Sequence, residues 1–366
     1  MKMQAKLVRP DYENCIANLP NSILKKWDVG TVGKTLPLAD RYLKKDYQNI
    51  VVLLLDGMEK CILEESLEQS GAFRSHLAGI YHSVFLSTTV AATTSMLTGQ
   101  QPCEHGWLGW DCYYPQIGKT VTVFRNTVQG TDEPAADFHV AGKYAPYTDI
   151  IHKIRTAGGN ACYCLPFVPP FPDSFEAVCS RIKALCREPG KKYIYAYWDQ
   201  PDGLLHKYGR RAPEVTAELK HMEACVAGMA RELADTLLFV TADHGHINTE
   251  SAVLQDYPAI TDCLVRLPSL EPRVLNFFVK EGKREKFVRA FRREFGDKFL
   301  LLPMAEAIDA KLMGTGRAHP LFRAMLGDFL AVAADDLSIF FAEEKCVSMH
   351  GSLTEDEMLI PLLVFA

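Results

Sequence analysis

The sequence predicts a doubly wound α/β fold, in which a mainly parallel sheet carries helices on both faces and a small α+β cap is inserted. Two observations predict it. Short apolar runs alternate with amphipathic stretches over most of the chain, as strands and crossover helices do in a parallel sheet. The 366 residues are also enough for one large α/β domain with an insertion, or for two domains.

The first half of the chain shows this alternation most clearly. Residues 50–55 form an apolar run that ends in Asp56, the pattern of a buried strand followed by a turn. Residues 147–157 indicate a helix, with Thr148 as its cap and Gly158 as its stop. The patterns that follow predict a strand, a helix and a strand, at 160–165, 174–186 and 193–197.

The second half continues the pattern. A longer helix is predicted from Pro213, because apolar residues recur there at steps of three and four. The next predicted strand, 236–242, ends in Asp243-His244-Gly245-His246. Two other predicted strands are followed by such residues, the first by Asp56 and a later one by the segment 199–206. Three predicted strands therefore finish in acidic or His-containing turns. Ligands bind beyond the carboxyl ends of such strands, so we expect these turns to face one crevice.

The predicted cap covers residues 256–320, and residues 1–255 and 321–366 form the predicted core. Within the cap, a strand at 274–279, a basic helix at 284–295 and a strand at 298–302 make a small β-α-β unit. Three phenylalanines fall on one face of this helix. After the cap, the sequence predicts a strand at 327–334, a capping box at 354–357 and an apolar final run at 358–365.

Charge and cysteine content exclude several classes of protein. A formal charge of −5 gives no bulk attraction to a nucleic acid polymer or an anionic membrane, so a phosphate site must supply its own positive charge. The first 27 residues lack the apolar core of a signal peptide. The number of cysteines, 11, is odd, and we therefore expect reduced thiols and a cytoplasmic protein.

Three Asp and three His form the candidate chemical site. Each residue alone is explained as a turn former, a helix cap or a surface residue. Jointly, they follow apolar runs in turn-like settings and make a plausible ligand set for two divalent metals. Imidazole and carboxylate suit Zn²⁺, and also Mn²⁺ or Fe²⁺. The alternative is that the six residues are unrelated to one another. The six are Asp56, Asp202, His206, Asp243, His244 and His350.

A hydroxyl-rich segment, 87–95, supplies a candidate nucleophile. It reads as a turn that leads into a short helix ending near Gly99. A hydroxyl at the start of that helix would lie where backbone N–H groups attract phosphate. Helix capping is the alternative explanation for these Ser and Thr residues.

The order of these motifs resembles the alkaline phosphatase superfamily, and within it the type I phosphodiesterase/nucleotide pyrophosphatase branch. The similarity runs from about residue 50 to residue 366 and rests on specific elements, Pro-Asp-x-x-x-His at 201–206 and Asp-His-Gly at 243–245. Thr98-Gly99, followed by Pro102-x-x-His105-Gly106, also matches the stretch after the nucleophile in that branch.

The resemblance implies a two-metal phosphoryl-transfer hydrolase. Counting back from Thr98-Gly99 places Thr89 at the nucleophile position. One metal would be held by Asp56, Asp243, His244 and Thr89, and the other by Asp202, His206 and His350. His246 and Asp199 lie close to these motifs but are not expected to ligate.

The implied reaction passes through a covalent phosphothreonyl intermediate. A threonine hydroxyl is a poor nucleophile at neutral pH, and a bound divalent cation lowers the proton affinity of its oxygen. Thr89 would attack phosphorus, and a water at the second metal would then release the phosphate. We expect a small phosphorylated substrate, such as a nucleotide.

One departure bears on the substrate. Nucleotide-cleaving members of the branch typically have the sequence Thr-Phe-Pro-Asn at the nucleophile, and the Asn side chain holds phosphoryl oxygens. This chain has Ala92 in place of that Asn. Three other activities therefore stay open as alternatives, those of a phosphomonoesterase, a phosphonate hydrolase and a phosphomutase. An inactive metal- or nucleotide-binding protein is a further alternative. The sulfatase signature is absent from 87–95. Trp107 and Trp110 are suited to stack on a base, although ordinary packing explains them equally well.

Overall fold

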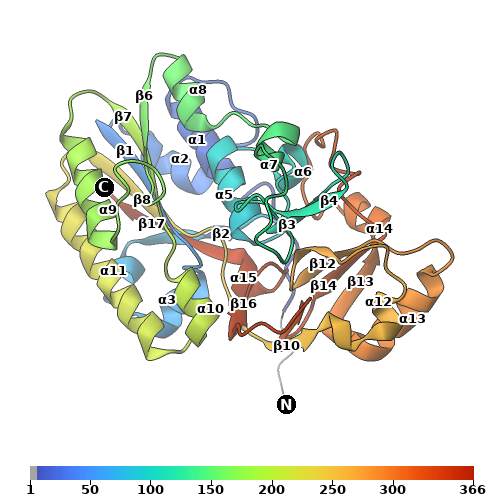
Figure 1. Ribbon diagram of the computed structural model, residues 1–366. Helices are drawn as coiled ribbons and strands as arrows, with labels where there is room; N and C mark the ends of the chain where they lie inside the picture. Colours follow the sequence, from blue (N-terminus) through green and yellow to red (C-terminus); the bar gives the residue numbers. More distant parts are fainter. Residues whose placement is uncertain (1–5) are drawn as a thin grey trace.

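A six-stranded sheet forms the centre of the part of the molecule drawn on the left of Figure 1. The computed structural model describes residues 6–366. Residues 1–5, which belong to the predicted core and to the first 27 residues considered above, lie outside the described residues. The strand order is β2 (Leu77–His82), β17 (Leu359–Phe365), β8 (Thr236–Thr241), β1 (Asn49–Leu55), β7 (Lys192–Trp198) and β6 (Asn160–Cys164). Only β17 runs against its neighbours in this sheet, so the sheet is mainly parallel as predicted.

Helices cover both faces of this sheet, which confirms the doubly wound fold (Figure 1). One face carries α3 (Lys60–Ser66), α4 (Ala72–Ser75), α9 (Phe175–Arg187) and α11 (Pro213–Glu232). The other face carries α1 (Asn18–Lys26), α2 (Pro37–Leu43), α5 (Thr89–Thr98) and α8 (Ile150–Thr156). All seven residues of β1 are buried, because a strand covered on both faces has no solvent side.

Helix α8 is capped by a different residue from the predicted one. Asp149, not Thr148, precedes its first turn, and the Asp149 Oδ1 accepts a hydrogen bond from the His152 N–H at 2.7 Å. The prediction failed by one residue because Thr148 and Asp149 are both good caps, and the local sequence does not decide where the helical dihedrals begin.

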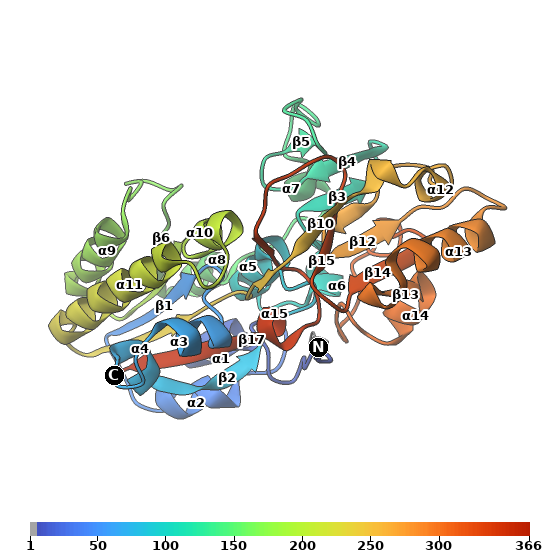
Figure 2. The same ribbon diagram turned by 90° about the horizontal axis from the view of Figure 1, so that it is seen from below.

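A second, antiparallel sheet lies beside the first, with helices at its outer side (Figure 1, Figure 2). Its seven strands follow the order β13 (Phe299–Pro303), β14 (Phe329–Ala333), β12 (Val274–Phe277), β11 (Ser269–Glu271), β3 (Asp111–Tyr114), β4 (Lys119–Thr122) and β5 (Thr127–Val128). Helix α13 (Arg284–Phe295) has the predicted bounds and buries its phenylalanine face. The strands of 256–320 thus pair with strands outside that range, so the division into core and cap stays a prediction.

Short elements complete the chain and bring the site together. They are α6 (Pro102–His105), α7 (Val140–Tyr144), α10 (Asp202–Tyr208), β9 (Ile247–Asn248), β10 (Glu250–Val253), α12 (Pro258–Thr261), α14 (Met304–Asp309), β15 (Leu337–Phe340), β16 (Ser348–Met349) and α15 (Glu355–Met358). β9 pairs with β16, and Ser87 bridges to Gly351. His350 is therefore held between the segment after β8 and the start of α5.

The predicted capping box at 354–357 is replaced by a buried ion pair. The Thr354 hydroxyl donates to Glu357 Oε2 at 2.6 Å instead of capping the helix. The Glu357 carboxylate accepts from Arg273 Nε at 2.7 Å and from Arg273 Nη2 at 3.0 Å, and both side chains are fully buried. The capping box failed because Glu357 is engaged by Arg273, which lies in the turn between β11 and β12 of the second sheet.

Candidate metal centre

Three carboxylates meet because their strands are neighbours. Asp56 follows β1, Asp243 follows β8, and Asp202 begins α10 after β7, and these strands are adjacent in the sheet. The Gly57 N–H donates to Asp243 Oδ1 at 3.1 Å, and the Asp202 N–H donates to the Asp56 carbonyl at 3.0 Å. A Cβ on Gly57 would lie 3.2 Å from the Asp202 Cα, and its φ is +74°, so glycine allows this close approach.

The first group of donor atoms surrounds the Thr89 hydroxyl. Thr89 Oγ1 lies 3.1 Å from His244 Nε2 and 3.4 Å from Asp56 Oδ2. The same His244 nitrogen lies 3.2 Å from Asp56 Oδ1 and 3.5 Å from Asp243 Oδ2. The structure therefore places together the four residues that the resemblance assigns to one metal.

The second group surrounds one oxygen of Asp202. The Nε2 atoms of His206 and His350 lie 3.4 Å and 3.8 Å from Asp202 Oδ1. His246, which is not expected to ligate, also lies in this group, with its Nε2 atom 2.7 Å from the same oxygen. Asp199 is not part of either group of converging donor atoms among the described residues.

The two groups adjoin each other. The rings of His244 and His350 stack with centroids 3.9 Å apart, although each belongs to a different group. Asp202 has a donor atom within 4.8 Å of Asp56 and His244 as well. All six predicted ligands therefore surround one buried region beyond the carboxyl ends of β1, β7 and β8.

The hydrogen bonds of the imidazoles show that these residues fit divalent cations. The Nδ1 atoms of His206, His244 and His350 face the carbonyls of Ser348, Gly245 and Ser87, at 2.9, 3.3 and 3.2 Å. Nδ1 must carry the proton to donate to a carbonyl, so in the neutral rings the Nε2 lone pairs point at the carboxylates. A divalent cation held between these nitrogens and the carboxylates takes the place of the protons that would otherwise be shared there.

Two carboxylate oxygens support the same conclusion. Asp56 Oδ1 and Asp243 Oδ2 are buried and have no hydrogen-bond partner among residues 6–366. Burial raises the pKa of Asp243 well above its usual range, and the neighbouring Asp56 raises it further. Burial opposes the charged form of His244, but Asp243 and Asp56 outweigh it and raise the His244 pKa to about 10. The site thus has an excess of negative charge that a cation would neutralise.

Thr89 is the first residue of α5, with Thr88 at the N-cap position and Gly99 as the left-handed C-cap. The hydroxyl of Thr93, a candidate phosphate donor, already donates to the Thr89 carbonyl at 2.6 Å. Ala92 is fully buried. The side chains of the first helical turn therefore offer little to a phosphate, which leaves the backbone N–H groups of the helix start.

Two supporting residues carry no motif that the sequence analysis could detect. The Tyr197 hydroxyl donates to Asp56 Oδ2. Glu271, on β11 of the second sheet, accepts from the Thr88 hydroxyl at 2.6 Å and from the Trp110 N–H at 2.7 Å. Tyr197 looks like one more aromatic residue of an apolar strand. Glu271 comes from a segment assigned to a separate cap.

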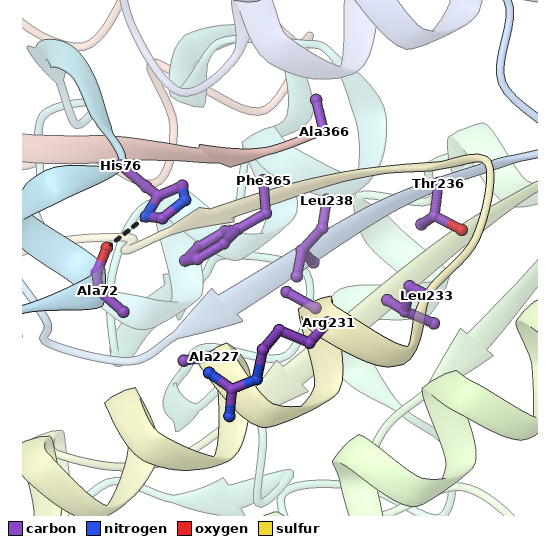
Figure 3. Close-up of a pocket in the computed structure, with 10 residues that line it drawn as sticks. Ala72, His76, Ala227, Arg231, Leu233, Thr236, Leu238, Phe365 and Ala366 are labelled. Atoms are coloured by element: carbon purple, nitrogen blue, oxygen red, sulfur yellow. Dashed lines mark hydrogen bonds between the residues drawn. The ribbon is translucent and has the colours of Figure 1, made fainter.

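A hollow of about 290 Å³ lies at the opposite end of the central sheet, where β17 ends and β8 begins (Figure 3). There the His76 ring stacks on Phe365 with centroids 4.1 Å apart, and its Nδ1 lies 2.8 Å from the Ala72 carbonyl. None of the candidate catalytic residues lines this hollow. Its position argues against a role in the chemistry of the metal centre.

Comparison with known proteins agrees with the fold. Residues 50–352 match the family described as type I phosphodiesterase / nucleotide pyrophosphatase. No curated protein sequence is similar enough to match. Murine ectonucleotide pyrophosphatase / phosphodiesterase 5, an inactive threonine-to-alanine variant in complex with AMP, has a similar structure, with a TM-score of 0.66, 17% identity and 87% of each chain covered.

A bacterial structure is similar to the same degree. Phosphonoacetate hydrolase from Sinorhizobium meliloti, in complex with phosphonoformate, gives a TM-score of 0.66 at 17% identity over 92% of each chain. No helix within residues 6–366 has both the length and the apolar character to cross a membrane. The chain belongs to the type I phosphodiesterase/nucleotide pyrophosphatase family of the alkaline phosphatase superfamily, whose members are metal-dependent phosphoryl hydrolases.

Proposed function

We propose that this protein hydrolyses phosphodiester or pyrophosphate bonds of a small phosphorylated substrate, with Thr89 as the nucleophile. The observation that carries the proposal is the position of the Thr89 hydroxyl at the start of α5. It lies within 3.4 Å of both Asp56 and His244, on the edge of a buried cluster of acidic and imidazole groups.

Two divalent ions fit the centre, and Zn²⁺ suits its mixture of imidazole and carboxylate donors. Asp56, Asp243, His244 and Thr89 would hold one ion, and Asp202, His206 and His350 the other. When bound, such ions neutralise phosphoryl oxygens and lower the proton affinity of a hydroxyl.

The chain's own residues then carry out two displacements. In the first, the bond from Thr89 Oγ1 to phosphorus forms as the bond to the leaving oxygen breaks; the hydroxyl proton passes through solvent to the leaving oxygen, and the product is a phosphothreonine. In the second, the oxygen of a water bonds to phosphorus and the bond to Thr89 breaks, which regenerates the hydroxyl. The N–H groups at the start of α5 face the transferred group and stabilise its negative charge.

The relatives support parts of this proposal. The murine protein is inactive when a threonine is replaced by alanine, and it binds AMP. A nucleotide is therefore the first substrate class to test. The exposed faces of Trp110 and Phe124 would suit a base, since these rings lie 6.2 Å apart and are 36% and 45% exposed.

A phosphonate or phosphomonoester is the second candidate, and Ala92 favours it. Its methyl group cannot hold a phosphoryl oxygen, which weakens the argument for a nucleotide diester. The bacterial neighbour binds phosphonoformate and phosphonoacetate. Matched nitrophenyl monoester and diester substrates, assayed with Zn²⁺ and Mn²⁺ separately, distinguish the two candidates by which ester has the higher kcat/KM.

Replacement of Thr89 tests the nucleophile. We expect Thr89→Ala to keep its metal content and lose at least about a hundredfold in kcat, while Thr89→Ser retains part of the activity. The control is Thr156→Ala, which removes an exposed hydroxyl at the end of α8. Acid quench during turnover followed by mass spectrometry should detect phosphate on Thr89. Full activity in a metal-loaded Thr89→Ala protein would rule out Thr89 as the nucleophile. A metal-loaded wild-type chain that turns over none of the esters would instead favour an inactive binding protein.

A reducing, cytoplasmic location is also proposed. All 11 cysteines lie in the described part of the chain and none forms a disulfide. Thiol titration of the denatured, unreduced protein should count all of them. A lower count would indicate disulfides and an oxidising compartment.

A further inference from the structure

We infer that His246 is a fourth ligand from the chain at the second metal position, in addition to Asp202, His206 and His350. This inference rests on the two-metal centre of the proposed function and deepens it. The sequence motifs alone assign no such role to His246. Its hydrogen bonds, its neighbours and its place in the backbone support the assignment.

The contacts of Ser348 orient the His246 ring. The Ser348 hydroxyl lies 2.8 Å from the Leu205 carbonyl oxygen and 3.0 Å from His246 Nδ1. The ring is thus held through Nδ1 on one side, and Nε2 faces Asp202 on the other.

That nitrogen faces the same oxygen as two other imidazoles. His246 Nε2 lies 2.7 Å from Asp202 Oδ1, closer than the Nε2 atoms of His206 and His350. The four donor atoms all lie within 4.8 Å of one another. Three imidazole nitrogens that converge on one carboxylate oxygen form a set of donor atoms that suits a divalent cation.

The backbone keeps His244 and His246 close together. Only Gly245 separates them, and their ring centroids lie 5.6 Å apart. A Cβ on Gly245 would lie 2.1 Å from the Asp356 carbonyl oxygen, so the segment packs too tightly for any other residue. The pairing of β9 with β16 then places His246 beside His350, with ring centroids 4.9 Å apart.

The fourth chain ligand makes the two positions unequal, because it would be the imidazole of His246 at the second position and the neutral hydroxyl of Thr89 at the first. Four strong ligands would satisfy an ion at the second position without substrate, whereas catalytic sites commonly keep one place open. The second position should therefore bind its ion more tightly and release it more slowly. Substrate or water would have to enter there as a fifth ligand.

Cobalt substitution tests the inference without relying on activity. The probe is Co²⁺ added to metal-free protein, followed by visible absorption and by proton NMR of the exchangeable, paramagnetically shifted imidazole N–H signals. Each ligand histidine contributes one such signal from its Nδ1. We expect the fully loaded wild-type chain to show four signals, from His206, His244, His246 and His350, and a count of three overturns the inference.

Variants give a second, independent readout. We expect His246→Gln to bind two ions still, but with about a 10- to 100-fold weaker Kd at one of them and one N–H signal fewer. Ser348→Ala removes the hydroxyl that contacts both His246 Nδ1 and the Leu205 carbonyl, and should weaken the same position to a smaller extent. The control is His152→Gln on the exposed side of α8. If His246→Gln leaves the Kd for Co²⁺ and the spectrum unchanged, the inference is overturned and the proposed function stays intact. If the wild-type chain binds no Co²⁺, the two-metal centre itself is overturned.

Discussion

The hydroxyl of Thr88 donates to the buried carboxylate of Glu271 at 2.6 Å, which ties the residue before the nucleophile to the second sheet. The same carboxylate oxygen accepts from the Trp110 N–H at 2.7 Å. Glu271 also lies against Gly351, next to His350, where an added Cβ would be 3.2 Å away. One side chain of the second sheet thus braces the start of α5, the aromatic loop and a predicted metal ligand.

Glu271→Leu should lower both stability and turnover. It leaves the Thr88 hydroxyl and the Trp110 N–H without an acceptor, and each costs about 1–3 kcal/mol when buried. Glu271→Gln keeps an acceptor oxygen and should lose less of both. Urea unfolding and kcat measured on the three proteins check this, and a Leu variant as stable as wild type would contradict it.

The charge of Glu271 predicts a dependence of stability on pH. Burial raises its pKa from 4.5 to about 7, against the opposing hydrogen bonds of Thr88 and Trp110. A carboxyl whose pKa is higher in the folded chain binds more protons there, so its contribution to stability is lost as pH rises from 4.5 to 7. Relative to Glu271→Gln, we expect wild type to lose up to about 3 kcal/mol between pH 4.5 and pH 8. Parallel urea titrations that show the same pH dependence for both proteins refute this.

Removal of metal should destabilise the protein through Asp56 and Asp243. Both carboxylates are buried, and each has an oxygen without a hydrogen-bond partner within residues 6–366. We expect a chelator to lower the Tm of wild type by several degrees, because like charges are then left uncompensated. The Tm of Asp243→Asn should fall less on chelation, since one charge is already gone. Equal decreases in calorimetry would show that charge repulsion is not the cause.

Tyr197 should act on metal affinity by holding Asp56. Its hydroxyl donates to Asp56 Oδ2, the oxygen nearer Thr89. We expect Tyr197→Phe to weaken one of two Co²⁺ binding steps about 10-fold or more, because outer hydrogen bonds orient metal ligands. Raising the metal concentration should then restore much of the activity. Tyr42→Phe, on α2, is the control, and a variant with normal Co²⁺ affinity would exclude this role.

The Arg273–Glu357 ion pair should matter far more than surface ion pairs. Arg273→Ala leaves the Glu357 carboxylate buried without its cation, a change that costs about 3–5 kcal/mol. The control Arg289→Ala breaks a 3.5 Å pair with Glu285 whose side chains are 73% and 91% exposed, and should cost less than about 1 kcal/mol. Denaturant unfolding of the two variants compares the losses directly, and similar values would contradict the prediction.

The sequence alone determined the elements whose pattern is local. Strand β1 and helices α11 and α13 were predicted closely, because a continuous apolar run or a repeated step of three and four is visible within each segment. The six predicted ligands could also be chosen from sequence, since each follows an apolar run in a short motif. The strand ends carry the polar residues, and parallel strands bring their ends to one edge.

Only the tertiary structure decided which distant segments complete one another. Glu271 reaches Thr88 across the boundary of the predicted cap, because strands 269–277 pair with strands on both sides of that range in the sequence. Arg273 displaces the predicted capping box for the same reason. The position of His246 depends on Ser348 and Asp202, which lie far from it in the chain. Sequence periodicity reports which face of an element is buried, whereas these contacts depend on how the two sheets are packed together.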